Sequence, residues 1–98
     1  MAFGDKKANS DYDPEFARLM ENRMLTSFHK YGAWKDNRPK VDAIKNIKLR
    51  IDHYLKTGNT EGLVDAANFC MMEWALPIHP KAHFRAEESG ESPSIAKF

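Results

Sequence analysis

The sequence of 98 residues has little of several features that define common protein classes. Its one cysteine, Cys70, excludes a disulfide framework or a cysteine-rich zinc site within one chain. No apolar run approaches the ~20 residues that a membrane-spanning helix needs, and residues 1–9 lack the apolar segment of a secretory signal. The net charge of +1 is too small for a protein that coats nucleic acids in general. These absences predict a small cytoplasmic protein that binds neither membranes nor nucleic acids in general.

Charge is divided between two consecutive segments. Residues 29–56 hold eight Lys and Arg against three Asp, a net of +5, whereas residues 57–76 hold three carboxylates and no Lys or Arg, a net of −3. A basic segment followed by an acidic one can hold a phosphate and a metal ion, but the two segments more commonly pair with each other.

The spacing of apolar residues predicts an all-α protein with three helices, over about 14–31, 41–56 and 60–76. Asp13 and Pro14 indicate the first helix start, Gly32 and Gly58 end the first and second helices, and Pro77 follows the third. Residues 1–12 are polar and are expected to be mobile, and the Pro-containing residues 77–98 are expected to form an extended tail.

Each predicted helix carries one apolar stripe. The stripes comprise Phe16, Met20, Met24, Phe28 and Tyr31, then Ile44, Ile47, Ile51, Tyr54 and Leu55, then Leu63, Ala67, Cys70, Met71 and Trp74. The third stripe is expected to be buried, with Cys70 as a core thiol. Three helices of about 16 residues bury too little surface to be stable alone. We therefore expect a homo-oligomer, a dimer or higher, that forms one helical bundle.

Acidic residues on the third helix are candidates for metal binding. Glu61, Asp65 and Asn68 have the spacing of one helical stripe, opposite the apolar stripe. Carboxylate and amide oxygens are ligands that Mg²⁺ prefers, so Glu61 and Asp65 are predicted metal ligands, and a solvated helix face is the alternative.

Polar residues on the second helix suggest the other half of a pocket. Asp42, Asn46 and His53 lie on one side of that helix with Arg50 at the flank, opposite its isoleucines. If this stripe faces Asn68, the mixture of amides, histidine and guanidinium suits a phosphorylated polar metabolite, and two helices joined by salt bridges are the alternative.

The segment between the first two helices, residues 32–40, is expected to be a loop. Trp34 could stack on a base while Arg38 and Lys40 meet phosphate, or Trp34 could anchor the loop to the bundle. The tail adds His83 and Arg85 as candidate ligand-binding residues. A glycine-rich phosphate loop and a serine elbow are both absent from the sequence.

Several motifs resemble a group of small uncharacterised phage and bacterial proteins. The motifs are Lys30-Tyr31-Gly32-x-Trp34, Asp42-Ala43-Ile44-x-Asn46-Ile47, the run from Thr57 to Asn68, His83-Phe84-Arg85 and Glu91-Ser92-Pro93. They cover roughly residues 28–93. The group implies no settled activity, and for a phage-encoded member the compartment would be the host cytoplasm.

More distantly, the helical layout resembles the all-α nucleotide pyrophosphohydrolases, the MazG-like family. Members are helical oligomers that hydrolyse nucleoside triphosphates with Mg²⁺ held by carboxylates. Their pattern pairs Glu-Glu-x-x-Glu with a later Glu-x-x-Asp, to which this sequence matches Asp65, with Glu61 as a substitute and Gly62 in the place of a metal-binding glutamate.

Three functions are compatible with these observations. The first is a non-catalytic oligomer that sequesters a nucleotide or a nucleotide-derived signal, which in a phage would counter host defence. The second is a Mg²⁺-dependent nucleotide pyrophosphohydrolase that uses Glu61, Asp65 and Glu73. The third is a protein-binding module that inhibits a host factor through its apolar surface and its tail.

Overall fold

A computed structural model describes residues 11–86, and every regular element within them is helical. The elements are α2 (Pro14–Tyr31), α3 (Trp34–Asn37), the 3₁₀ turn η1 (Arg38–Lys40), α4 (Ala43–Thr57) and α5 (Glu61–Ala75). The all-α prediction is confirmed. The count of three helices omitted α3, because residues 32–40 form a short helix and a turn rather than a loop. The predictions for residues 1–10 and 87–98 lie outside the described residues.

The helices begin and end where local chemistry predicts. Asp13 accepts a hydrogen bond from the Glu15 amide at 2.9 Å, and Asp42 accepts one from the Lys45 amide at 3.0 Å. Gly58 ends α4 in the left-handed conformation, with φ of 75°, where a side chain would be strained. Helix α4 begins at Ala43, two residues later than expected, because Asp42 is its N-cap and not its second residue.

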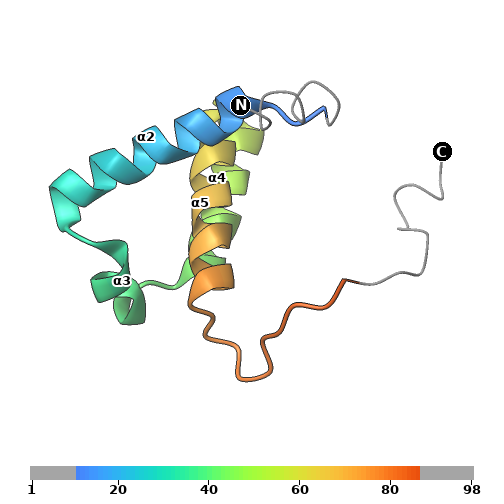
Figure 1. The fold of residues 1–98 in the computed structure, drawn as a ribbon. Coiled ribbons are helices and arrows are strands. Elements are labelled where there is room, and N and C mark those ends of the chain that lie inside the picture. Colours follow the sequence, from blue (N-terminus) through green and yellow to red (C-terminus); the bar gives the residue numbers. More distant parts are fainter. Residues whose placement is uncertain (1–10, 87–98) are drawn as a thin grey trace, which may run out of the picture.

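Helices α4 and α5 form a tightly packed antiparallel hairpin, in which α5 follows α4 after a short turn (Figure 1). At Gly62 the two backbones come so close that an added Cβ would lie 2.7 Å from the carbonyl oxygen of Arg50. Ala43 and Ala66 are also buried. Small side chains at this seam therefore let the helices approach closely.

Helix α2 crosses the α4–α5 hairpin and then leads away from it, and the chain returns through α3 and η1 (Figure 1). No residue of α2 is fully buried. Asn68 of α5 donates a hydrogen bond to the carbonyl oxygen of Met20 at 3.1 Å, and Arg23 pairs with Asp65 at 3.0 Å. At the other end, Arg38 donates to the carbonyl oxygen of Leu76 at 3.0 Å. Helix α2 thus contacts the N-terminal half of α5, and η1 contacts the segment just after the C-terminal end of α5. We call the arrangement of α2, α3, η1 and α5 the frame.

The observed core differs from the predicted one. The buried apolar residues among those described are Ala43, Val64, Ala66 and Met72. The predicted buried stripe of the third helix is wrong, since Cys70 is exposed and Trp74 is 71% exposed. The reason is that α5 turns its small residues toward α4 and its polar residues toward α2, which leaves its apolar stripe on the outside.

Within residues 11–86, no helix combines the length and the apolar character needed to cross a membrane.

Candidate ligand-binding pocket

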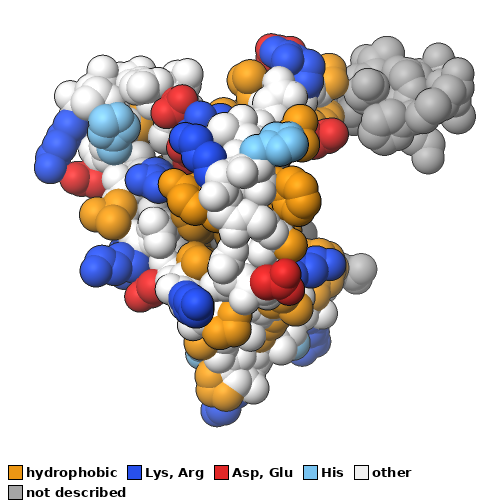
Figure 2. Space-filling model, turned by 90° about the vertical axis from the view of Figure 1, so that its left-hand side faces the viewer, with side chains coloured by type: hydrophobic (Ala, Val, Ile, Leu, Met, Phe, Trp, Pro, Cys, Tyr) orange, Lys and Arg blue, Asp and Glu red, His pale blue; other side chains and the backbone are white. Residues whose placement is uncertain are grey.

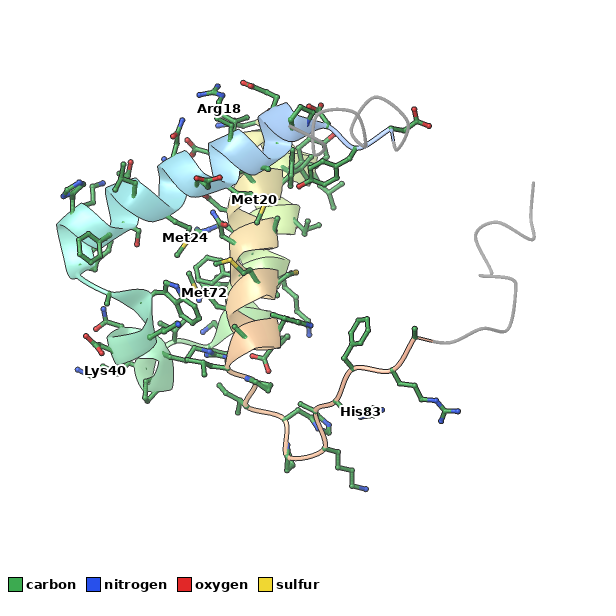
Figure 3. The ribbon with its side chains drawn as sticks, in the orientation of Figure 1. Arg18, Met20, Met24, Lys40, Met72 and His83 are labelled. Atoms are coloured by element: carbon green, nitrogen blue, oxygen red, sulfur yellow. The ribbon has the colours of Figure 1, made fainter. Side chains whose placement is uncertain are left out.

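A pocket of about 550 Å³ lies inside the frame formed by α2, the α3–η1 segment and α5, with Arg50 of α4 in its wall. Met24 of α2 and Met72 of α5 both line it, and they project into the space between these helices (Figure 3). A second hollow of about 780 Å³ shares Met24, Trp34 and Asn68 with the first. The two hollows therefore meet along the contact between α2 and α5.

Cationic side chains dominate the charged lining of the first pocket. Arg23, Lys30, Arg38 and Arg50 contribute to it, against the single carboxylate of Asp65. Figure 2 shows Lys and Arg side chains beside hydrophobic ones on the face that carries the α2–α3 connection. Arg23 pairs with Asp65 and Glu61, and Arg38 pairs with Glu73, so Lys30 and Arg50 supply the positive charge that an anionic group could meet beside the apolar lining.

Three aromatic residues line the same pocket. They are Tyr31 at the end of α2, Trp34 at the start of α3 and Phe69 of α5. The guanidinium carbon of Arg50 lies 5.6 Å from the centre of the Phe69 ring, which is a cation–π distance. The Nζ atom of Lys35 lies 5.9 Å from the centre of the Trp34 ring. Flat faces bordered by cations are surfaces on which a heteroaromatic ring can stack.

Two buried polar atoms of the lining residues have no hydrogen-bond partner in the described part of the chain. They are Oδ1 of Asn68 and Nε of Arg50. Asn68 is only 4% exposed, and its other amide atom, Nδ2, is held by Met20. Buried polar atoms in folded proteins are nearly always paired, so these two atoms are exceptions within residues 11–86.

Arg38 is a structural residue, because all three of its guanidinium nitrogens are engaged. Nε donates to the carbonyl oxygen of Leu76 at 3.0 Å, Nη1 donates to that of Val41 at 2.8 Å, and Nη2 pairs with Glu73. The side chain is 5% exposed. The guanidinium therefore closes the frame between η1 and α5, and its burial leaves little of its surface for a phosphate.

Glu73 completes this closure. The Ile78 amide donates to its Oε2 at 2.9 Å, and this hydrogen bond, with the pairing to Arg38, lowers the pKa of Glu73 from its ordinary value of 4.5 although partial burial opposes the shift. The carboxylate thus ties the residues after α5 to η1.

The two predicted metal ligands face α2 and share one arginine. Arg23 Nε lies 3.0 Å from Asp65 Oδ1, and its Nη1 lies 3.4 Å from Glu61 Oε2. The hydrogen bond with Asp65, stronger than the opposing effect of burial, raises the pKa of Arg23. Among residues 11–86, no three His, Cys, Asp or Glu side chains are grouped closely enough to hold one metal ion.

The structure brings together part of the predicted ligand site. Trp34, Arg38, Arg50, Asp65 and Asn68 line the same pocket. The expected pairing of the two polar stripes is thus present at Arg50 and Asn68 only.

The remaining predicted residues lie elsewhere. Asp42 caps α4, Asn46 donates to the Asp42 carbonyl oxygen, and His53 is exposed on α4. Lys40 projects from η1 away from the frame, and His83 lies on the irregular tail, where it contacts the Lys81 carbonyl oxygen (Figure 3).

Arg85 is likewise exposed on the tail, outside the lining of both hollows. The structure does not bring Asp42, Asn46 and His53 together with Asn68, because α2 and not α4 covers the polar side of α5.

Sequence reasoning missed the contribution of α2. Arg23, Ser27 and Lys30 line the pocket at a spacing of four and three residues, which is one polar stripe beside the methionines of the same helix. That stripe was visible in the sequence and could have been recognised. Phe69 had no comparable signal, because it falls between the apolar and polar stripes of α5.

Comparisons with protein-family models, with curated proteins and with solved structures gave no match, so the geometry alone carries the functional interpretation.

Proposed function

We propose that the protein binds an anionic heteroaromatic ligand of the nucleotide type in this pocket and releases it unchanged. The observation that carries the proposal is the joint lining by aromatic and cationic side chains around a space of about 550 Å³. This volume falls within the range of about 300–1,000 Å³ that is usual for small-molecule sites.

The pocket lining offers separate contacts for the ring and for the anionic group of such a ligand. Trp34 and Phe69 offer ring faces, and Lys30 on α2 offers an exposed ammonium for an anionic group. A sequestering protein in a phage would act on a host signal of this chemical class.

Binding is favoured over hydrolysis by the state of the carboxylates. Metal-dependent attack on a phosphate needs an ion held by several oxygen ligands. Glu61 and Asp65 each pair with Arg23, and Glu73 pairs with Arg38 at the far end of α5. The residues of the pyrophosphohydrolase alternative are thus divided between two ends of one helix.

The test is thermal unfolding of the purified protein with nucleoside phosphates, cyclic dinucleotides and ADP-ribose, each with and without Mg²⁺, followed by chromatography of the recovered ligand. A ligand at 100 times its Kd should stabilise the protein by about 2.7 kcal/mol, which is a shift of several degrees. Recovery of the intact ligand supports the proposal. A cleaved product that Asp65→Asn no longer forms supports hydrolysis instead.

A matched pair of variants locates the ligand. Lys30→Met removes a lining cation, whereas Lys40→Met removes an exposed cation outside the pocket. We expect weaker binding from the first variant only. No shift with any ligand of the panel overturns the proposal and favours the protein-binding alternative, in which the exposed tail residues Ile78 and Phe84 contact a host protein.

We also propose that the chain forms a homodimer through the α4–α5 hairpin. The hairpin face, defined here as Ile44, Ile51 and Leu55 of α4 with Leu63, Ala67, Cys70 and Trp74 of α5, lies by helical geometry on the side away from α2. Leu55 is 73% and Trp74 is 71% exposed.

A second copy is the occupant that best fits this face. Within residues 11–86 only four apolar residues are buried, which is a small core for a stable single chain, so a partner that covers the hairpin face should be present whenever the chain folds. Another copy meets that requirement, and two antiparallel hairpins of equal 15-residue helices form a four-helix bundle.

Sedimentation analysis of the wild-type protein tests the dimer. We expect twice the chain mass of 11.3 kDa, and a folded monomer at micromolar concentration would overturn the proposal. Leu55→Glu should weaken the dimer. Leu49→Glu, the same change at an exposed residue of α4 outside the hairpin face, should leave it intact.

A further inference from the structure

The described part of the tail, residues 77–86, forms an arm whose base is fixed by hydrogen bonds. Glu73 accepts one from the Ile78 amide at 2.9 Å, and Arg38 donates one to the carbonyl oxygen of Leu76 at 3.0 Å. Arg38 also pairs with Glu73. The direction in which the arm leaves α5 is therefore set by polar contacts with η1 and α5.

Beyond its base the arm leads away from the rest of the described chain. The Ala82 amide donates to the carbonyl oxygen of His79 at 3.1 Å, which closes a turn, and the next residues lie on the side of α5 opposite to α3 (Figure 1). All residues of the arm are exposed, and Phe84 is 80% exposed and lines neither hollow. The arm thus holds an aromatic side chain away from the core of its own chain.

The second hollow, of about 780 Å³, presents apolar side chains that stay exposed. Met20, Met24, Leu25 and Phe28 of α2 line it together with Met71 of α5. Leu25 is 58% and Phe28 is 55% exposed. Apolar surface grouped around a hollow is typical of a site that binds another apolar group, and methionine side chains adapt to the shape of what they contact.

An unpaired charge accompanies each of these features. Arg85 follows Phe84 on the arm, and the exposed Glu21 lines the second hollow. Neither of these charges forms an ion pair within residues 11–86. The other charged residue in the described lining, Lys35, lies beside the Trp34 ring. The arm therefore carries a cation next to its aromatic residue, and the hollow has a carboxylate available at its rim.

We infer that the two copies of the proposed homodimer exchange their arms. Phe84 of each copy binds in the second hollow of the other, and Arg85 pairs with Glu21 of the partner subunit. The inference rests on the proposed homodimer but not on the nucleotide-type ligand. A second copy is the occupant because each arm leads away from its own hollow, and because its aromatic residue and cation match the apolar lining and the carboxylate there.

The length of the arm permits the exchange. From Pro77 to Phe84 the chain can span at most about 25 Å. Packed helices lie about 8–10 Å apart, so the arm of a copy that lies on the hairpin face can pass α5 of the partner and reach the hollow beside it. The exchange would cover the second hollow and leave the first pocket to the ligand.

Truncation of the aromatic side chain tests whether it anchors the dimer. Phe84→Ala should raise the Kd of the dimer, measured by sedimentation, about tenfold or more, as for a buried interface anchor. His83→Ala, the same change at the preceding exposed residue, is the control and should leave the Kd within about twofold. Because Phe84 is 80% exposed in the single chain, its loss should not disturb folding. An unchanged Kd in Phe84→Ala overturns the inference.

A reversal of charges tests the contact between Arg85 and Glu21. Glu21→Arg and Arg85→Glu each bring like charges together, and each should raise the Kd by about two- to fivefold, the usual scale for an exposed ion pair. The double variant restores the pair with opposite signs and should return the Kd to within about twofold of the wild-type value. A double variant as weak as either single variant overturns this contact.

Cross-linking identifies the chain that supplies the arm. In a Cys70→Ser background, chains with Ala86→Cys and chains with Asn22→Cys, in the lining of the second hollow, carry different tags and are expressed together. We expect mild oxidation to form a disulfide between the two tagged chains. Lys48→Cys, exposed on α4 and outside the second hollow, replaces Asn22→Cys as the control and should not form one.

The outcomes separate the inference from the dimer on which it rests. A wild-type monomer in sedimentation overturns the homodimer and the exchange with it, whereas a dimer that forms no disulfide with Asn22→Cys overturns the exchange alone. A single chain with both Ala86→Cys and Asn22→Cys that closes on itself shows that the arm fills its own hollow, which also overturns the inference. Nucleotide binding is tested separately, by thermal unfolding with the ligands.

Discussion

Two arginines connect α5 to the N-terminal part of the chain, and they do so in opposite ways. Arg38 is 5% exposed and engages two backbone carbonyl oxygens and Glu73 at the C-terminal end of α5. Arg23 is 43% exposed and pairs with Glu61 and Asp65 at the N-terminal end. The first contact is a buried connection between segments, and the second is a surface ion pair.

The difference indicates which end of the frame can adjust. Solvent-exposed ion pairs contribute little to stability and are weakened by salt, whereas a buried guanidinium that is hydrogen-bonded through all three nitrogens is costly to disturb. The closed end at Arg38 therefore fixes the position of α3 and η1. The open end is held by the exposed Arg23 and by the hydrogen bond from Asn68 to Met20, so we expect it to be the weaker of the two, and the proposed ligand lies between them.

The largest effect is expected from breaking the closed end. Arg38→Met removes one partner of a mostly buried ion pair and leaves the Leu76 and Val41 carbonyl oxygens without their donor. We expect a loss of about 3–5 kcal/mol in the free energy of unfolding, measured with urea. Lys40→Met, an exposed change two residues away, should cost less than about 0.5 kcal/mol. Equal costs would show that Arg38 does not hold the frame.

The next largest effect is expected where α4 and α5 are in close contact. Gly62→Ala would place a Cβ 2.7 Å from the Arg50 carbonyl oxygen, so the two helices must separate. Overpacking of this kind costs about 1–3 kcal/mol, against a gain of about 1 kcal/mol from replacing glycine by alanine within a helix. We expect net destabilisation in urea. An increase in stability would show that the helix backbones are not in close contact at this residue.

A smaller effect is the pH dependence of the closed end. Because the Ile78 amide and Arg38 lower the pKa of Glu73 from 4.5, its charged form stabilises the fold above that pH. This contribution is lost as the pH falls through the lowered value. We expect wild-type protein to be more stable than Glu73→Gln at pH 7, and the difference in unfolding free energy to narrow below pH 4.5. A difference that stays constant with pH would contradict the assignment.

The helices could be predicted from the sequence because their ends are determined locally. Asp13 and Asp42 cap through their own side chains, and Gly58 takes a backbone conformation that few other residues tolerate. These signals act within a few residues, so they do not depend on the rest of the fold.

The packing could not be predicted, because it depends on which face of each helix meets its neighbour. Gly62 and Ala66 allow α4 to approach, and this contact rotates Trp74 outward although it belongs to the most apolar stripe. The same rotation placed Asn68 under α2 rather than opposite His53. Polar residues of α5 were predicted to form a site with polar residues of α4, whereas in the structure they contact Met20 and Arg23 of α2.

The smallest effect is expected at the open end. Arg23→Met keeps most of the side-chain stem and removes only the charge that pairs with Glu61 and Asp65. Since the arginine is 43% exposed, water and salt screen the pair, and we expect a cost below about 1 kcal/mol at low salt. The cost should shrink further in 1 M NaCl, where the screening length is only about 3 Å. Urea unfolding at both salt concentrations measures it, beside Arg38→Met under the same conditions. A cost at Arg23 as large as that at Arg38 would mean that α2 is held as firmly as η1, and that the pocket cannot open by movement of α2.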